Sequence, residues 1–249
     1  MPTPFMHLVM ADAMLAQPGL PDALRERLTA GRPAFRFGHT APDAQTVSGQ
    51  SRESTHFFSV PMTSRRAAQE IMFERHADLA RPAGLDPARA AFLTGYLCHL
   101  LLDQLWIAEI FQPIFGERAA WGTFPERLYL HNVLRAYLDR RDLPRLANGV
   151  RDSLCAAKPA NWLPFIDDRH LRRWRDLVAD QLAPGASART IEIFARRMDR
   201  DPHDFEALLA SPEELDRQVF SRIPLERIAA FRVEGLARSL ELTRKYWRD

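Results

Sequence analysis

Residues 95–106, GYLCHLLLDQLW, form a long apolar run that is interrupted by His99 and Asp103 at a spacing of four. On an α-helix, residues i and i+4 are neighbours on one face, with Cβ atoms roughly 5–6 Å apart. The two side chains can therefore reach one common point from a single rigid helix. Such a pair is either a buried hydrogen bond or one half of a binding site.

Apolar residues recur at helical spacing along most of the chain, and alternating, strand-like runs are scarce. Asp86 followed by Pro87 is typical of a helix start, and Pro184 with Gly185 is typical of a helix end. We therefore predict an all-α multi-helix bundle. The predicted helices span residues 5–17, 21–30, 64–80, 87–112, 125–141, 143–156, 168–183, 187–200, 203–222 and 224–247, with boundaries good to a few residues.

One segment, residues 33–61, lacks this periodicity and is rich in Gly, Ser, Thr and Pro. It predicts a long irregular loop near the site, and a loop of this length is usually functional or disordered. Its four phenylalanines argue against disorder. Since the sequence shows no repeat and no flexible linker, we predict one domain over residues 1–249.

The composition is that of an ordinary soluble protein, with 46% hydrophobic and 27% charged residues. The 34 cationic residues nearly balance 32 acidic ones, so nucleic acid is an unlikely partner. Cys98 and Cys155 show no metal-binding spacing and are expected to be reduced thiols. Without a basic leader or a membrane-length apolar run, the sequence predicts a cytoplasmic protein with no transmembrane segment. The oligomeric state is left open.

The polar residues in the first hundred positions form a pattern of histidines close to aspartates. The histidines in apolar or Pro/Gly-rich surroundings are His7, His39, His56 and His99, near Asp12, Asp43 and Asp103. Neutral imidazoles together with carboxylates suit zinc and related divalent ions. His99 and Asp103 would supply two ligands from one helix, and Asp43, His56 and His7 are the further candidates.

Each of these residues also has an interpretation without a metal. His99 and Asp103 could form a buried hydrogen bond in a dry core. His7, in PFMHLV, could be a core histidine with satisfied hydrogen bonds. Asp43, in GHTAPD, could cap the turn around Pro42. Their joint occurrence is what favours a metal site.

Taken in order, the motifs PFMHL, GHTAPD, STHFF and GYLCHLLLD resemble the zinc-dependent phospholipase C family. Bacterial members of that family hydrolyse phosphatidylcholine, and its all-α fold also serves single-strand nucleases. The resemblance covers residues 4–115, so residues 125–249 are expected to add helices that complete the bundle. The metal ligands that the resemblance implies are His7, Asp43, His56, His99 and Asp103.

The chain also departs from the family pattern. In the family's extracellular enzymes the mature amino terminus joins the metal cluster after a signal peptide is removed, and no such peptide is recognisable here. The family places a further metal on a histidine soon after the HxxxD and then an HxxxE, whereas here the next histidine is His131 and position 135 is Arg. The resemblance therefore implies zinc or a similar divalent cation, as one or two ions rather than three. His39 and His131 are outside candidates as ligands.

The activity that the resemblance implies is hydrolysis of a phosphate ester, either a small molecule or a phospholipid, by a metal-activated water. A divalent ion lowers the pKa of bound water towards about 7, and two ions about 3.5–4 Å apart can hold both nucleophile and phosphoryl oxygen. Asp103 would bridge two ions, and Asp43 would be the catalytic residue that orients or deprotonates the water. The alternative is a non-catalytic helical protein of the same fold, with a structural metal or none.

Overall fold

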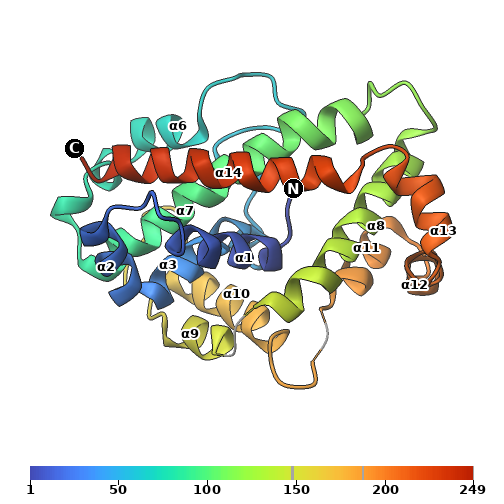
Figure 1. The fold of residues 1–249 in the computed structure, drawn as a ribbon. Helices are drawn as coiled ribbons and strands as arrows, with labels where there is room; N and C mark the ends of the chain where they lie inside the picture. Colours follow the sequence, from blue (N-terminus) through green and yellow to red (C-terminus); the bar gives the residue numbers. More distant parts are fainter. Residues whose placement is uncertain (147–148, 187, 249) are drawn as a thin grey trace.

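The computed structural model describes residues 1–146, 149–186 and 188–248. Over these residues all the regular secondary structure is helical and there is no β-strand, which confirms the prediction of an all-α multi-helix bundle (Figure 1). The α-helices are α1 (Pro4–Leu15), α2 (Asp22–Ala30), α3 (Arg32–Gly38), α4 (Gln45–Ser48), α5 (Arg52–His56), α6 (Ala68–Arg75), α7 (Pro87–Trp106), α8 (Phe124–Asp142), α9 (Val150–Ala156), α10 (Asp168–Asp180), α11 (Thr190–Met198), α12 (Pro202–Ala210), α13 (Pro212–Leu215) and α14 (Leu225–Tyr246). Short 3-10 turns span Ala41–Ala44, Ala77–Leu79, Pro82–Gly84 and Leu143–Arg145, and π-helical segments span Ile107–Phe115 and Asp216–Phe220.

Helix α7 is the central helix and begins as the sequence predicts. The Asp86 side chain accepts hydrogen bonds from the backbone of Ala88 and Arg89, and Pro87 occupies the first turn, where its missing N–H is not needed. The helix contacts α2, α3, α6 and α14. Its first half lies in one hydrophobic core and its second half in another, with Leu100 in the former and Leu102 in the latter. Helix α7 therefore joins the two cores of the molecule.

Two glycines bring α3 and α7 into backbone contact. A Cβ placed on Gly95 would lie 2.2 Å from the carbonyl oxygen of Phe35, and one on Gly38 would lie 2.0 Å from that of Phe92. No side chain fits at such distances, so only glycine permits this approach. The contact fixes the chain that follows α3 against the face of α7 that carries His99.

The predicted irregular loop over residues 33–61 is partly wrong. Its first residues belong to α3, where Phe35 and Phe37 are fully buried and drive the helix into the core. The rest of the segment consists of single helical turns, including α4 and α5, joined by short bends. The Gly- and Pro-rich composition therefore marks frequent interruptions of helix rather than a lack of it.

Four predicted helices are shorter or more interrupted than expected. The one predicted over 203–222 breaks at Ser211, which is extended because the following Pro212 disfavours a helical conformation before it. The one predicted over 64–80 begins only at Ala68, and the one over 87–112 turns π-helical after Trp106, around Pro113. The one predicted over 143–156 begins with a 3-10 turn around Pro144 and becomes an α-helix at Val150.

Residues 147, 148, 187 and 249 lie outside the described residues. Residues 147 and 148 fall in the helix predicted over 143–156, and residue 187 would have begun the one predicted over 187–200. In the described part, the latter helix is α11, Thr190–Met198. Residue 249 ends the single domain that the sequence predicts.

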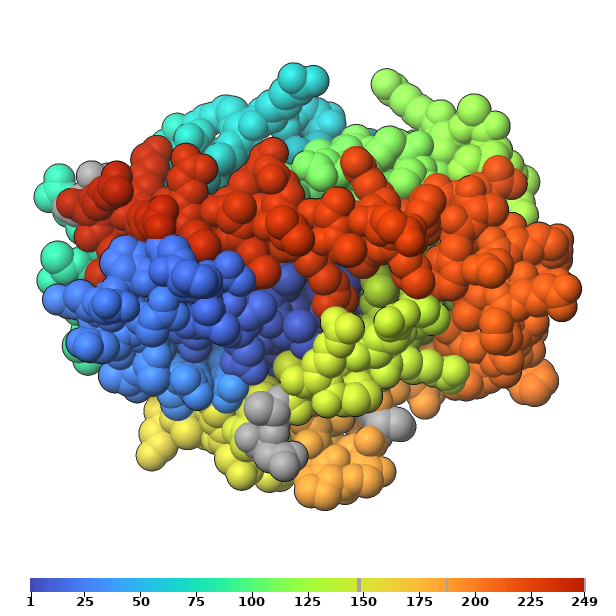
Figure 2. Space-filling model, viewed as in Figure 1, coloured from blue at the N-terminus to red at the C-terminus, as the bar shows by residue number. Residues whose placement is uncertain are grey.

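Helix α14 crosses one face of the molecule as a continuous band, beside the N-terminal helices and the cyan segment that precedes α7 (Figure 2). It also links both cores, through Phe231 at one end and Tyr246 at the other. Beneath it, the stretch Pro87–Phe115 is long and apolar enough to cross a membrane by length and composition alone. Since 94% of its most apolar window is buried inside the protein, its apolar character is also what a central core helix requires.

Candidate metal centre

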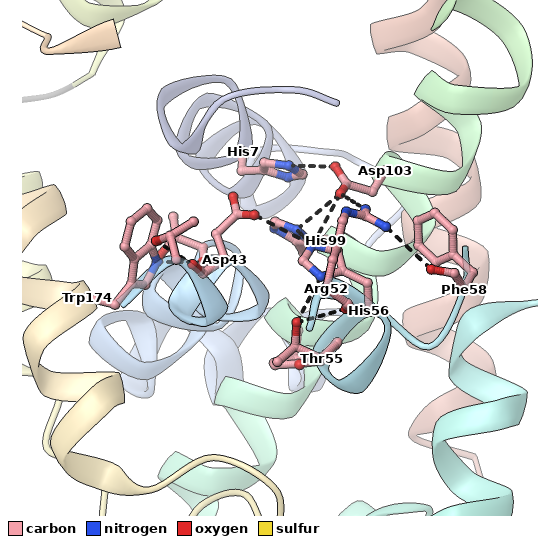
Figure 3. A network of polar contacts seen from close by, with 12 residues as sticks. His7, Asp43, Arg52, Thr55, His56, Phe58, His99, Asp103 and Trp174 are labelled. Carbon is pink, nitrogen blue, oxygen red and sulfur yellow. Dashed lines mark hydrogen bonds and ion pairs between the residues drawn. The ribbon is translucent and has the colours of Figure 1, made fainter. Parts of the chain in front are cut away.

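Five side chains that the sequence singles out converge at the junction of the two cores (Figure 3). They come from four separate parts of the chain: α1, the 3-10 turn after α3, α5 and α7. The residues are His7, Asp43, His56, His99 and Asp103. Four of the five are essentially inaccessible to solvent, and the Asp43 side chain is 18% exposed. Buried imidazole and carboxylate groups at this density could hold a metal ion.

The closest set consists of His56, His99, Asp43 and Asp103. The Nε2 atom of His56 lies 3.3 Å from Nε2 of His99, 3.4 Å from Oδ2 of Asp103 and 3.6 Å from Oδ1 of Asp43. Nε2 of His99 lies 3.6 Å from Oδ2 of Asp103. In a tetrahedral site with bonds of 2.0–2.1 Å, neighbouring ligand atoms are roughly 3.3–3.4 Å apart. Four of the six pairs of ligand atoms in this set are therefore spaced almost as a zinc ion would space them.

Hydrogen bonds outside the cluster aim both imidazoles at its centre. Nδ1 of His99 lies 2.8 Å from the carbonyl oxygen of His39, an acceptor, so this nitrogen carries the proton. Nδ1 of His56 lies 2.9 Å from the Thr55 hydroxyl, which itself donates to the carbonyl of Arg52 and must therefore accept from His56. In both rings the lone pair of Nε2 then faces the cluster. This arrangement of partners is typical of histidines that bind metals.

A second set shares Asp103 and His99 with the first. Nε2 of His7 lies 3.3 Å from Oδ1 of Asp103, whereas His56 and His99 approach the other oxygen, Oδ2. The ring of His7 stacks on that of His99, with centroids 3.9 Å apart. The Asp103 carboxylate thus presents one oxygen to each set, and His7, His99 and Asp103 are a second group that could hold an ion.

The electrostatics of the cluster favour positive charge at its centre. Burial raises the pKa of Asp103, but the charge of His99 and the contacts with the three imidazoles outweigh it and hold the pKa well below the usual value. Burial likewise raises the pKa of Asp43, yet its contact with His56 and the charge of His99 bring the pKa down to about 2. Both carboxylates are therefore ionised at neutral pH.

The surroundings of the cluster shift the pKa values of His99 and His7 in opposite directions. Burial lowers the pKa of His99, but the charge and hydrogen bond of Asp103 outweigh it, so the pKa lies above the ordinary value. Burial, and then the charge of His99, lower the pKa of His7 to about 4. His7 is thus neutral at pH 7, the form in which imidazole binds a metal. A proton on His99 and a metal ion would compete for the same negative surroundings.

Asp43 is held at the edge of the cluster by a contact from α10. The indole nitrogen of Trp174 donates a 2.7 Å hydrogen bond to the carbonyl of Thr40, at the start of the turn that carries Asp43 (Figure 3). Pro42 lies at the first turn of this 3-10 segment, as is usual for proline. Asp43 is the one ligand candidate with appreciable exposure, so it forms the least enclosed edge of the cluster.

The two outside candidates lie apart from the ligand sets. The ring of His39 packs edge-on against Phe35, and burial lowers its pKa well below the ordinary value, so its contribution to the cluster is the carbonyl that holds His99. His131 lies in a separate aromatic pocket, where Nε2 accepts a 2.9 Å hydrogen bond from Trp106. That bond occupies the lone pair that a metal would need.

Thr55 and Trp174 belong to the site but are not predicted as part of it, and Arg52, which the sequence offers among many arginines only as a possible phosphate ligand, contacts a ligand candidate instead. Arg52 donates a 2.8 Å hydrogen bond to Oδ2 of Asp103 and stacks over the ring of Phe58 at 4.4 Å. Its spacing of four from His56 in RESTH, within one short helix, is a signal that the sequence does carry. Thr55 acts through its hydrogen bond with the adjacent His56. Trp174 acts through its hydrogen bond to Thr40, 134 positions away, and no local sequence pattern indicates that contact.

Two further cationic groups act on the cluster. Burial, and then the charge of Arg135, lower the pKa of the Met1 amino group well below its usual value, while Asp103 opposes them. Burial also lowers the pKa of Arg135 to about 10, against the charges of Asp139, Asp43 and Asp103. Arg135 therefore remains a cation at neutral pH and lies within the electrostatic range of both cluster carboxylates.

We compared the chain with protein-family models, with curated proteins and with solved structures, and no match was found. The assignment of a function therefore rests on the residues and geometry of the cluster itself.

Proposed function

We propose that the protein is a metal-dependent hydrolase of phosphate esters, similar in its site to the zinc-dependent phospholipases C. The observation that carries the proposal is a set of two imidazoles and two carboxylates in which four of the six pairs of ligand atoms are 3.3–3.6 Å apart, with both Nε2 lone pairs facing inward. Zinc or a similar divalent cation suits these nitrogen and oxygen donors. The order of the motifs along the chain gives the proposal further support.

In this proposal His56, His99, Asp43 and Asp103 would hold one ion, and His7 with Asp103 would hold another. A bound divalent ion would polarise the phosphoryl group and make water a nucleophile near neutral pH. Asp43 is the catalytic residue, since it lies at the solvent-facing edge, where it can accept a hydrogen bond from the attacking water. Its pKa of about 2 makes it a weak base, so its role is to orient the water rather than to keep the proton.

The substrate class is a phosphate ester, either a small molecule or a phospholipid. One cavity has lining residues that follow His56 closely in the sequence. Its volume is about 550 Å³, and it is lined by Val60, Pro61, Met62, Phe111 and Phe124 among others. None of the ligand candidates lines this cavity, and its apolar residues would suit only the organic part of such an ester.

The alternative is a non-catalytic helical protein in which the same residues hold a structural metal or none. The burial of His56, His99 and Asp103 favours this non-catalytic alternative. A structural zinc site is closed by four protein ligands, whereas a catalytic zinc site keeps one coordination position open. The exposed edge at Asp43 is what favours the enzyme.

The experiment measures metal and activity on the same sample. Protein purified without chelator is expected to contain close to one or two equivalents of zinc or a similar ion, and to hydrolyse a phosphodiester, a phosphomonoester or phosphatidylcholine vesicles. H99A should lose most of the metal and the activity, whereas H203A, which changes an exposed histidine on α12, should keep both. Full metal content with no hydrolysis of any of the three substrates would favour the structural alternative. A protein that neither contains nor takes up metal would refute both metal-binding functions.

A further inference from the structure

Arg135 is a cation of α8 whose hydrogen-bonding capacity is largely unused. It is partly buried, its Nη1 donates a 3.0 Å hydrogen bond to Oδ1 of Asn132, and its guanidinium stacks over the ring of Phe194 at 4.3 Å. Its Nε atom is buried and has no hydrogen-bond partner among the described residues. A guanidinium group carries five N–H donors in a fixed fork, so most of the donors of Arg135 are free.

Arg135 also lacks a counter-ion. In the described part of the chain it forms no ion pair, unlike Arg52, whose guanidinium is bound to Asp103. Asp139, one turn further along α8, exerts the largest attractive charge on Arg135, but its two oxygens accept hydrogen bonds from Thr3 and Thr190 instead. A buried cation without a paired anion is costly, which is why such groups are rare in folded proteins.

The charge of the whole site calls for an anionic ligand. The two cluster carboxylates, Asp43 and Asp103, are balanced by the two guanidinium groups of Arg52 and Arg135. One divalent ion in the cluster leaves an excess of two positive charges, and a second ion increases it. Arg52 and Arg135 each have a buried Nε–H without a hydrogen-bond partner, but among the described residues Arg135 is the one of the two that forms no ion pair.

We infer that Arg135 binds the phosphoryl oxygens of the substrate, and that it forms an anion subsite beside the metal cluster. The inference rests on the proposed function, because it takes the ligand to be a phosphate ester. The planar fork of arginine matches two phosphoryl oxygens at once, which a lysine cannot do. Arg52 stays on Asp103 and orients that carboxylate, and Arg135 holds the anion.

The test uses phenylphosphonate, a non-hydrolysable anion, titrated into the zinc-loaded protein by calorimetry. R135Q removes the charge and the fork, R135K keeps the charge alone, and R196Q changes an exposed arginine on the neighbouring helix α11. We expect R135Q to weaken binding about ten- to a hundredfold, R135K to weaken it less, and R196Q to leave it unchanged. Metal content should be the same in all four proteins, and R135Q should raise KM more than it lowers kcat.

Equal affinity of the wild type and R135Q for phenylphosphonate would overturn the inference, as would an equal loss in R196Q. If R135Q does not fold, as judged by circular dichroism, R135K decides: unchanged affinity and KM in that variant would also overturn it. Failure of the proposed function is a separate result. A wild type that hydrolyses no phosphate ester, but binds phenylphosphonate through Arg135, would refute the hydrolase and keep the anion subsite.

Discussion

His56 and His99 face each other with their Nε2 atoms 3.3 Å apart, while both rings donate Nδ1–H to the protein. Two lone pairs at that distance repel unless a positive charge lies between them. A proton on one ring or a metal ion bound to both would provide it. Because both neighbouring carboxylates are ionised, a divalent ion gains more from this position than a proton does.

The Thr55 hydroxyl should control metal affinity without touching the metal. In T55V, Nδ1–H of His56 loses its acceptor, so the ring is no longer held with Nε2 towards the cluster. We expect zinc affinity to fall about tenfold to a hundredfold, as measured by competition with a chromogenic chelator. T94V is the control, since Thr94 is also buried but bonds to Ala90 and Trp247. Equal affinity in T55V and the wild type would show that Thr55 does not orient His56.

Substitution of Gly95 should disrupt the packing of α3 on α7. The Cβ of G95A would lie 2.2 Å from a backbone oxygen, so the two helices must separate. We expect the free energy of unfolding to fall by about 1–3 kcal/mol in urea titrations. G84A is the matched control, because a Cβ on Gly84 meets nothing within 4 Å. A G95A protein as stable as G84A would mean that the helices can separate freely.

The free energy of unfolding should fall as the pH rises, because the buried Asp139 side chain loses its proton. Burial raises its pKa from 3.8 to about 7, so between these values the folded state binds the proton more tightly than the unfolded chain does. The stabilisation is complete below about pH 4 and is lost as the pH rises through 7. D139N cannot ionise, so relative to the wild type it should gain up to about 3 kcal/mol between pH 5 and pH 8.

Urea unfolding of both proteins at the two pH values measures this difference. D22N, a change at an aspartate whose side chain is 97% exposed, should follow the wild type. Parallel pH profiles for D139N and the wild type would show that Asp139 is ionised throughout that range.

Metal removal should lower the stability of the whole fold. The ligand candidates belong to four separate parts of the chain, so an ion bound to the folded state alone would stabilise it by mass action. At an ion concentration about a thousand times Kd, this amounts to about 4 kcal/mol. A chelator should therefore lower Tm in the wild type and leave H99A unchanged. An identical Tm with and without chelator in the wild type would count against tight metal binding.

The sequence predicts the ligand candidates better than it predicts their surroundings. His99 and Asp103 are predicted from their i, i+4 spacing, because residues four apart lie on the same face of an α-helix. His7, Asp43 and His56 are found only because polar residues in apolar or turn contexts demand an explanation. The structure brings all five together, and it leaves His39 and His131 outside the ligand sets.

What the sequence does not predict depends on contacts between distant segments. Trp174 contacts the turn that carries Asp43 across 134 positions, and no local pattern encodes that contact. Arg135 is one of many arginines, and its lack of a counter-ion is a property of the packed structure. The segment 33–61 differs from its prediction because burial of Phe35 and Phe37, which its Gly- and Pro-rich composition does not reveal, decides the conformation at its start.

The backbone contact of α3 with α7 has a consequence for the order of folding. The carbonyl of His39 and the ring of His99 are 60 positions apart, and they meet only after that contact has closed a long loop. Closure of such a loop costs entropy before any ligand atom gains a partner. An ion would therefore find too few donors on the unfolded chain to guide it. We therefore expect the cluster to form late in folding rather than to nucleate it.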